Sequence, residues 1–202
     1  KNSLQITEIF SQNRPVIIRV PGEAYGDLSK RILKAFIKAI PVILARRRQD
    51  TNRKDYFLIM DEGCSYFDET MIDLCKKAGS AGVKLVITRM CDADFQNENP
   101  AFLGRMLSAF SVYLCFQTND PDTRDTMARL SMTFDDQKMT QRTVNGYQTG
   151  DGTMTEAQRF RIRPTEFGML PVGIAYVIAP SLNIFRKIKI LPPEVELKGG
   201  LA

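Results

Sequence analysis

The sequence predicts an α/β fold with a mainly parallel sheet flanked by helices, followed by antiparallel strands near the C-terminal end. Short apolar runs alternate with helix-like segments between residues 14 and 131, and this alternation is typical of parallel strands joined by crossover helices. From residue 160 the period changes to two, which is typical of antiparallel strands. We find no internal repeat and no clear linker between two domains.

Four short runs predict buried strands, because each is too short and too rich in β-branched or aromatic residues for a helix. They are VIIRV (16–20), YFLIM (56–60), KLVIT (84–88) and VYLCF (112–116). Ligands of parallel sheets gather at the C-terminal ends of the strands. The residues after each run are therefore the first candidates for a functional site.

A helix is predicted between the first two runs. Apolar residues recur at helical spacing from Leu28 to Ile43, and lysines repeat every four residues on another face, which indicates an amphipathic helix of about five turns. Pro41 cannot donate a hydrogen bond to the carbonyl of Ile37, so we expect a kink or a break into two helices there.

Further helices are predicted between the later runs. Apolar residues on one face indicate a helix from Phe67 to Ala78, and Gly79 offers a C-terminal cap. Asn99-Pro100 and Asp120-Pro121 predict the starts of two more helices.

The last third of the chain begins with a polar segment. Residues 135–159 are mostly polar and are expected to bury almost nothing apolar, so we expect an exposed, mobile loop or a loose hairpin. Beyond it, GIAYVI (173–178) and IFRKIKI (184–190) are expected to be closing strands.

The composition excludes several kinds of site. The chain has no histidine, which removes Ser-His-Asp and Cys-His triads and favours hard metal ions such as magnesium. No apolar run approaches the roughly 18–20 residues of a membrane span, and no signal peptide is evident, so we expect a soluble piece. The cysteines form no C-x-x-C pair and are interpreted as reduced core thiols in a reducing compartment: Cys64, Cys75, Cys91 and Cys115.

Two adjacent carboxylates, Asp61 and Glu62, directly follow the run YFLIM. Such a pair suits nucleotide hydrolysis, in which the first acid holds magnesium and the second orients or deprotonates the attacking water. In the alternative interpretation, Asp61 begins a turn or caps the next helix, although Ser65 and Asp68 lie closer to that helix.

Thr88 and Arg89 end the next strand, on the same predicted edge of the sheet. A hydroxyl and a guanidinium there can contact the terminal phosphate of a nucleotide, and Arg89 can do so bidentately. The alternative is a surface arginine that pairs with Asp92 or Asp94. No G-x-x-x-x-G-K-[ST] motif occurs, so these residues form only part of a nucleotide site.

The order of these motifs resembles the second half of the motor domain of conjugative coupling proteins of the TraD type, RecA-like and FtsK-like ATPases of type IV secretion. The resemblance covers about residues 14–190. It is carried by RPVIIRVPGEAYGD, YFLIMDEGCSYF with the crossover to KLVITR, SVYLCFQTNDPDTRDTMARL and RIRPTEFGMLPVGIAYVI. It implies that residues 1–202 are the C-terminal part of a RecA-like P-loop ATPase core, with the phosphate loop and membrane anchor upstream.

The resemblance also implies the chemistry of the site. Asp61-Glu62 corresponds to the Walker B pair, and Leu170-Pro171 with Gly173 to a late turn of the family. ATP and Mg2+ are the implied cofactors, with Asp61 as the metal ligand and Glu62 as a catalytic residue; Arg89 is added as a second catalytic candidate from its place at the strand end. Asp61, Glu62, Thr88 and Arg89 are the implied nucleotide-binding residues. Without a phosphate loop, the 202 residues alone are expected to be inactive.

The implied partners are other copies in a hexameric ring, single-stranded or double-stranded DNA, and relaxosome or secretion-channel proteins. The implied location is the cytoplasmic side of the bacterial inner membrane, reached through an N-terminal anchor. The net charge of +5 suits a polyanionic partner. For DNA contact the sequence offers ARRRQ (45–49) and Lys76-Lys77, although ARRRQ also fits as favourable charge at a helix C-terminus.

Two departures from the family pattern favour an alternative function. Gly79 stands where the family has an arginine thought to reach the neighbouring subunit's nucleotide, and Arg89 stands where it has a glutamine. Arg105, Arg124 and Arg129 can substitute in trans. The alternative is a weakly active or inactive RecA-like module for assembly or substrate docking.

The resemblance also makes the isolated piece look incomplete. In RecA-like sheets the phosphate-loop strand lies in the middle, so its absence leaves strand edges unpaired and an apolar face open. We therefore expect residues 1–202 alone to be unstable, to aggregate or to borrow a strand from another copy.

Overall fold

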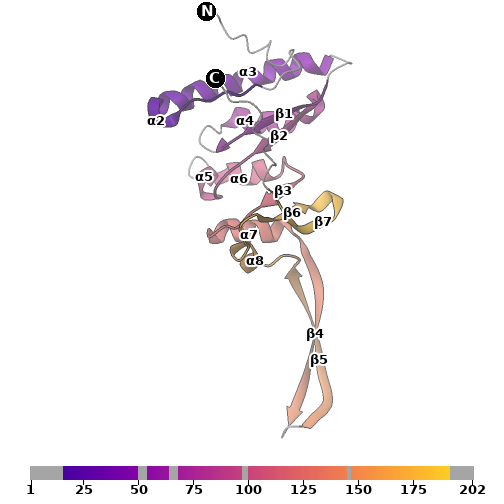
Figure 1. The fold of residues 1–202 in the computed structure, drawn as a ribbon. Helices are drawn as coiled ribbons and strands as arrows, with labels where there is room; N and C mark the ends of the chain where they lie inside the picture. Colours follow the sequence, from indigo (N-terminus) through magenta and orange to yellow (C-terminus); the bar gives the residue numbers. More distant parts are fainter. Residues whose placement is uncertain (1–15, 50–53, 64–67, 97–99, 145–146, 192–202) are drawn as a thin grey trace, which may run out of the picture. The chain divides into compact units, whose positions relative to one another are not determined.

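A computed structural model describes residues 16–49, 54–63, 68–96, 100–144 and 147–191. The chain forms two compact units, Lys1–Phe110 and Ser111–Ala202. Figure 1 shows the helices and strands of each unit. The α/β class is confirmed, because helices accompany one parallel and two antiparallel sheets.

The first unit contains a two-stranded parallel sheet of β1 (Tyr56–Met60) and β2 (Val83–Ile87). The crossover between them consists of α4 (Glu69–Lys77) and a short 3-10 turn, η2 (Gly79–Ala81). The two strands, their parallel pairing and the helix that joins them are as predicted. Their predicted burial is wrong, because one face of each strand is exposed.

A long helix packs against this crossover. After the single turn α2 (Gly22–Tyr25), α3 (Asp27–Gln49) contacts both α4 and η2. α3 runs without interruption through Pro41, so the predicted break is wrong, and the alternative of a kink stays a prediction. Ile40 and Leu44, on either side of Pro41, are almost fully buried, and this packing offsets the loss of one backbone hydrogen bond.

The core of the first unit lies between α3, α4, the sheet and two further helices. These helices are α5 (Ala93–Gln96) and α6 (Pro100–Leu107), and α6 begins at the predicted proline. The most buried apolar residues of this core are Ile40, Leu44, Met71, Ile72, Leu74, Ala81, Val83 and Phe95. Phe57, Ile59 and Val86, on the strands themselves, are each at least 40% exposed.

Two local predictions for the first unit are wrong. Residues 16–20 form no strand, because a strand needs a paired neighbour and, among the described residues, β1 and β2 pair only with each other. Gly79 does not end α4, whose C-cap is Ala78. The glycine with a left-handed backbone conformation lies three residues later: it is Gly82, which has φ of +70° and caps η2.

The second unit contains a three-stranded antiparallel sheet in the order β3-β6-β7. Its strands are β3 (Tyr113–Cys115), β6 (Ile174–Ala179) and β7 (Ile184–Lys189). The two closing strands are confirmed. The expected parallel pairing of residues 112–116 is wrong, because β3 pairs antiparallel with β6 and buries Cys115 beside Tyr176 and Ile178.

Helices and turns complete this sheet. They are α7 (Pro121–Leu130), α8 (Pro164–Gly168) and the 3-10 turn η3 (Pro180–Leu182). α7 begins as predicted, since the carboxylate of Asp120 accepts a hydrogen bond from Thr123 N at 2.9 Å. Phe167 is fully buried and meets the ring of Tyr176 edge-on, with the ring centroids 5.3 Å apart.

The polar segment forms a hairpin of β4 (Thr133–Val144) and β5 (Tyr147–Phe160). The register shifts between Gln141 and Thr143. Its expected turn, Asn145-Gly146, lies outside the described residues. The hairpin alternative therefore holds, and the mobility of the segment stays a prediction.

In the described ranges, no helix has the length and apolar character needed to cross a bilayer. Three of the four cysteines can be placed, and Cys75, Cys91 and Cys115 are all free thiols. Burial raises the pKa of the Cys75 thiol to about 11. Cys64 lies outside the described residues.

Candidate functional site

The carboxylate pair lies where the parallel strands end. Asp61 and Glu62 follow the last residue of β1 and are exposed. Parallel pairing of Met60 with Ile87 brings Thr88 alongside them. Thr88 N donates to the carbonyl of Met60 at 3.0 Å, and Gly63 N donates to the carbonyl of Thr88 at 3.1 Å. The backbone ladder thus continues past the strands and fixes this edge.

The hydroxyl of Thr88 joins both acidic residues. Its oxygen accepts a hydrogen bond from Glu62 N at 3.0 Å. The same hydroxyl donates to Asp61 Oδ1 at 2.5 Å. One side chain therefore holds the carboxylate of the first acid and the backbone of the second. The grouping of Asp61, Glu62 and Thr88 at one edge is as predicted.

The turn that carries the pair is tightly constrained. Glu62 has φ of +49°, a left-handed conformation that few non-glycine residues adopt. At the next residue, a Cβ on Gly63 would lie 2.6 Å from Ile87 Cγ2, so this position requires glycine. Strained backbone of this kind tends to occur at functional sites, and it could not be predicted from the sequence.

The alternative role for Asp61, as the cap of the next helix, belongs to another residue. Asp68 Oδ1 accepts hydrogen bonds from Thr70 N at 2.9 Å and from Met71 N at 3.4 Å, which caps α4. Ser65, the other candidate, lies outside the described residues. Asp61 is thus not needed to begin α4, but it lies in a turn, as the other half of that alternative expects.

Arg89 adopts the alternative arrangement, an ion pair with Asp92. The Asp92 side chain is completely buried and that of Arg89 is 14% exposed. The guanidinium carbon also lies 5.7 Å from the ring centroid of Phe95, a cation–π distance. Nearby, Cys91 N donates to Asp94 Oδ2 at 3.2 Å. Arg89 therefore stabilises the segment that follows β2. Its contact with phosphate stays a prediction.

The arginines predicted to act in trans have structural contacts of their own. Arg105 Nη1 lies 2.7 Å from Glu69 Oε1, and this hydrogen bond raises the pKa of the already basic guanidinium. The Arg124 guanidinium packs close to Gly168, and Arg129 lies in the last turn of α7. These contacts do not identify any of the three arginines as an arginine finger.

The residues predicted to contact DNA are largely engaged in local structure. Arg47 Nη2 donates to the carbonyl of Lys54 at 2.5 Å and stacks on the ring of Tyr56. Arg48 Nη2 donates to the carbonyl of Lys77 at 3.2 Å, and Lys77 pairs with Asp73. Arg46, Arg47 and Arg48 lie in the last turn of α3, which agrees with the alternative of favourable charge at a helix C-terminus.

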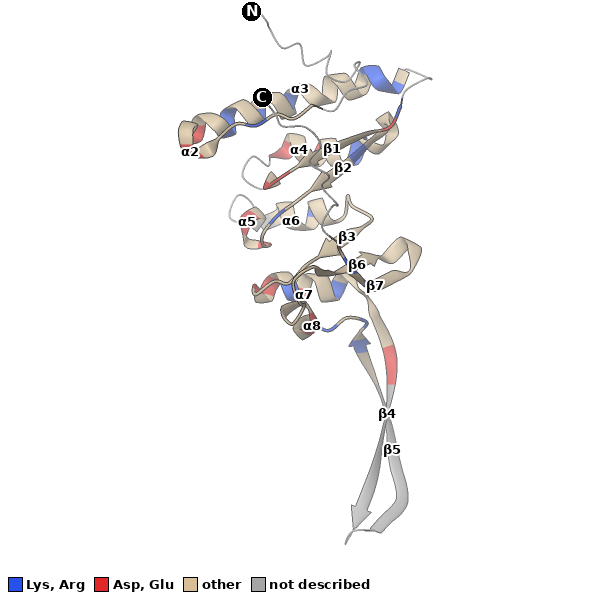
Figure 2. Cartoon of the chain, in the orientation of Figure 1, with Lys and Arg blue, Asp and Glu red and all other residues tan. Residues whose placement is uncertain are grey.

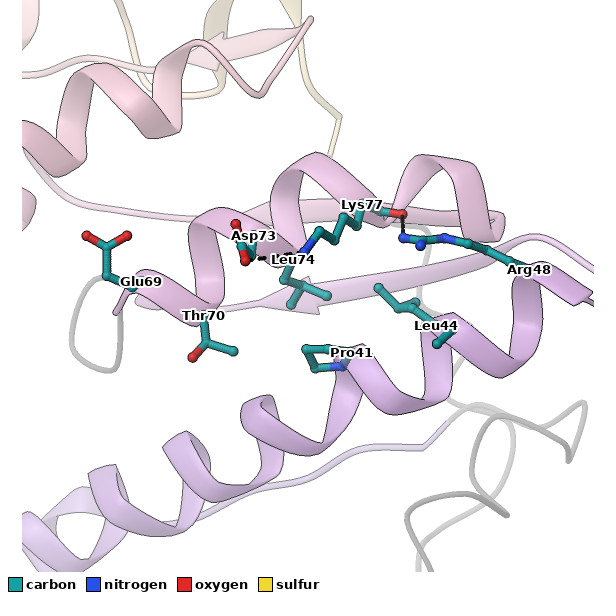
Figure 3. Close-up of a pocket in the computed structure, with 9 residues that line it drawn as sticks. Pro41, Leu44, Arg48, Glu69, Thr70, Asp73, Leu74 and Lys77 are labelled. Carbon is teal, nitrogen blue, oxygen red and sulfur yellow. Dashed lines mark hydrogen bonds and ion pairs between the residues drawn. The ribbon is translucent and has the colours of Figure 1, made fainter.

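A groove of about 520 Å³ lies between α3 and α4 and was not predicted from the sequence. Figure 3 shows Pro41, Leu44 and Leu74 facing one another across it, with charged side chains around them. None of the predicted nucleotide-binding residues lines this groove.

The donor set at the strand ends suits magnesium. The described residues contain no group of three or more His, Cys, Asp or Glu side chains able to hold a metal. Magnesium does not require such a group, because it commonly binds one or two carboxylates and takes its other ligands from water and phosphate. Asp61 and Glu62 meet that requirement.

Comparisons with known proteins give a likeness of fold. No family model and no curated protein sequence matches the chain. The unbound monoclinic form of the bacterial conjugative coupling protein TrwB is similar over 84% of this chain and 39% of that one, with 16% identity and a TM-score of 0.65.

Two nucleotide complexes of TrwB are similar as well. For the complex with the non-hydrolysable ATP analogue ADPNP, the identity is 17% and the TM-score 0.62. For the complex with ADP and Mg2+, the identity is 17% and the TM-score 0.64. In both cases the likeness covers 84% of this chain and 38% of TrwB. The chain thus spans less than two fifths of the structures that share its fold.

Proposed function

We propose that this chain is part of the ATP-hydrolysing motor domain of a conjugative coupling protein, which delivers DNA or a protein–DNA complex to a type IV secretion channel. The observation that carries the proposal is the Asp61–Glu62 pair, held by Thr88 at the end of two parallel strands. The likeness to TrwB, which has been solved with an ATP analogue and with ADP and Mg2+, supports a nucleotide as the ligand.

Each acidic residue has a separate task in this proposal. Asp61 holds Mg2+, usually through water, and Glu62 orients or deprotonates the attacking water. Bound magnesium would neutralise charge on the phosphate oxygens. The Thr88 hydroxyl keeps both acids in register, and its exposed position also allows it to contact the terminal phosphate.

Arg89 is the second proposed contact for that phosphate. It has to leave Asp92, or share its guanidinium with it, to reach the nucleotide. Thr88 is therefore the stronger candidate for sensing the phosphate.

The wider assembly follows from the same proposal. The complete protein would contain a RecA-like core with a phosphate loop, form a hexameric ring and act at the cytoplasmic side of the bacterial inner membrane. Its partners would be DNA, further copies, and relaxosome or secretion-channel proteins.

The test is Glu62→Gln in the full-length protein. Removing the base should lower ATP turnover by roughly 100-fold or more while nucleotide affinity is retained, because Gln keeps the size of Glu. Glu23→Gln, at an exposed glutamate of α2, is the matched control and should leave turnover unchanged. Equal turnover in the Glu62 variant and the parent protein would reject the assignment.

One observation favours a second candidate, a RecA-like module for assembly or substrate docking with little or no catalysis. Arg89, the departure from the family pattern at the strand end, is held in an ion pair with a buried carboxylate. Full-length protein that binds ATP tightly but shows no DNA-stimulated hydrolysis would support this candidate over the motor.

A further inference from the structure

The positive charge of the chain is concentrated in one helix. α3 contains seven Lys or Arg residues and one Asp, an excess of six. The whole chain has 28 Lys or Arg and 23 Asp or Glu residues, an excess of five. The remaining residues are therefore close to neutral, and Figure 2 shows the basic positions along α3.

Four of these cations lie in the first half of α3. Lys30, Lys34 and Lys38 are four residues apart, and Arg31 lies beside them. Successive members of the row are about 6 Å apart along the helix axis, because each residue rises about 1.5 Å. This spacing is comparable with that of successive phosphates along an extended nucleic-acid strand.

The row is not neutralised by its surroundings. Within the described part of the chain, none of these four side chains has an ion-pair partner. The acids of α4, the helix that packs on α3, pair with other cations: Glu69 with Arg105 and Asp73 with Lys77. The row therefore carries uncompensated charge, with Lys30, Arg31 and Lys38 exposed and Lys34 half-buried.

The main apolar face of α3 is already used for folding. Ile37, Ile40 and Leu44 are buried in the core of the first unit. A helix that binds a membrane surface inserts its apolar face among the lipids, and here that face is occupied. Leu28, Ile32 and Val42 are exposed beside the cations, but the charged row dominates the remaining surface.

We propose that the Lys30, Arg31, Lys34 and Lys38 row of α3 binds the phosphate backbone of a nucleic-acid strand. This inference deepens the proposed function and rests on its DNA partner. It replaces the earlier candidates Arg47 and Arg48, whose guanidiniums donate to backbone carbonyls. Contacts with phosphates alone carry no sequence information, so the row binds strands of any sequence.

The test compares two double variants of the full-length protein. Lys30→Gln with Lys38→Gln removes two charges from the row. Arg186→Gln with Lys189→Gln removes two exposed charges from β7, in the other unit. Binding of a single-stranded oligonucleotide is measured without ATP over a range of salt concentrations, and thermal melting confirms that each variant is folded.

We expect the α3 variant to bind at least about 10-fold more weakly at low salt and to lose about 1.4 from the slope of log affinity against log salt, since each phosphate contact contributes about 0.7 for a single strand. The β7 variant should bind as the parent does. Basal ATP hydrolysis should stay unchanged in both variants.

Three results would overturn the inference. Equal affinity and slope in the α3 variant and the parent would reject the row as the contact surface, without bearing on the motor. Parent protein that binds no oligonucleotide would reject the DNA partner itself. Binding to vesicles of anionic phospholipid that the α3 variant loses, with oligonucleotide binding retained, would make the row a membrane surface instead.

Discussion

Two polar clusters begin at adjacent residues after β2, and they differ in burial. Thr88 joins Asp61 and Glu62 at an exposed edge. Arg89 pairs with Asp92, which is fully buried. Successive residues of an extended chain point to opposite sides, so Thr88 contacts the exposed carboxylates while the side chain of Arg89 packs into the fold. The comparison shows that position at a strand end does not by itself decide whether a polar side chain is exposed or packed.

The largest effect is expected from Asp92→Ala. It leaves the charge of Arg89, whose side chain is only 14% exposed, without its partner, and breaking a buried ion pair costs about 3–5 kcal/mol. Asp55→Ala is the control, because Asp55 pairs with Lys84 while both side chains are more than half exposed, and such pairs contribute about 1 kcal/mol or less. Urea titration measures the free energy of unfolding of both variants. Similar losses in the two variants would show that the buried pair is no more important for stability than the exposed pair.

Gly63→Ala should come next, with a loss of about 1–3 kcal/mol in the free energy of unfolding from overpacking. The added Cβ would lie 2.6 Å from Ile87 Cγ2, whereas a Cβ at Gly79 meets nothing within 4 Å. Gly79→Ala is therefore the matched control and should be close to neutral in the same urea titration. An unchanged Gly63 variant would show that the turn carrying the carboxylates is not tightly fitted.

Thr88→Val tests the exposed cluster. It keeps the shape of Thr88 but removes the bridge between Asp61 and Glu62, so ATP turnover of the full-length protein should fall by roughly 10-fold or more while the free energy of unfolding falls by only about 1 kcal/mol. Thr88→Ser retains the hydroxyl and should restore most of the turnover. Equal turnover in Val and Ser variants would contradict a positioning role.

A pH effect is expected in the second unit, where a carboxylate serves the fold as Asp92 does in the first. Tyr176 donates to Glu166 Oε2 at 2.5 Å, and this hydrogen bond lowers the pKa of Glu166 below its ordinary 4.5. A lowered pKa stabilises the fold above about pH 4.5, and this contribution is lost as pH falls through the folded value.

Tyr176→Phe should therefore lower the free energy of unfolding by about 1 kcal/mol near neutral pH, and the difference from the parent should shrink in acid. Chemical unfolding from pH 3 to 7 measures it. A difference that is constant over this range would mean that the hydrogen bond does not favour the charged form of Glu166.

Local patterns predicted the elements well, because they depend on neighbours in the sequence. YFLIM and the first four residues of KLVIT lie in strands, whereas VIIRV does not, and Pro100 and Pro121 begin helices. Pairing was predicted less well. The partner of β3 is β6, about 60 residues away, and apolar periodicity carries no information about which distant strand will be its neighbour.

The part of the candidate site that could be predicted is the part formed by residues directly after the parallel strands. Asp61, Glu62 and Thr88 come together because β1 and β2 are parallel and in register. The left-handed φ of Glu62 was not predictable, since glutamate has no local preference for that conformation. For Arg89 the sequence offered both a phosphate and Asp92, and packing against Phe95 favours the second.

The β4–β5 hairpin is expected to unfold locally before the rest of the protein. Its strands of 12 and 14 residues extend over about 40 Å at roughly 3.4 Å per residue. In the described residues they pair only with each other, and isolated two-stranded hairpins are marginally stable. The amide protons of its outer half can thus exchange with solvent through local opening, at a free energy far below that of global unfolding.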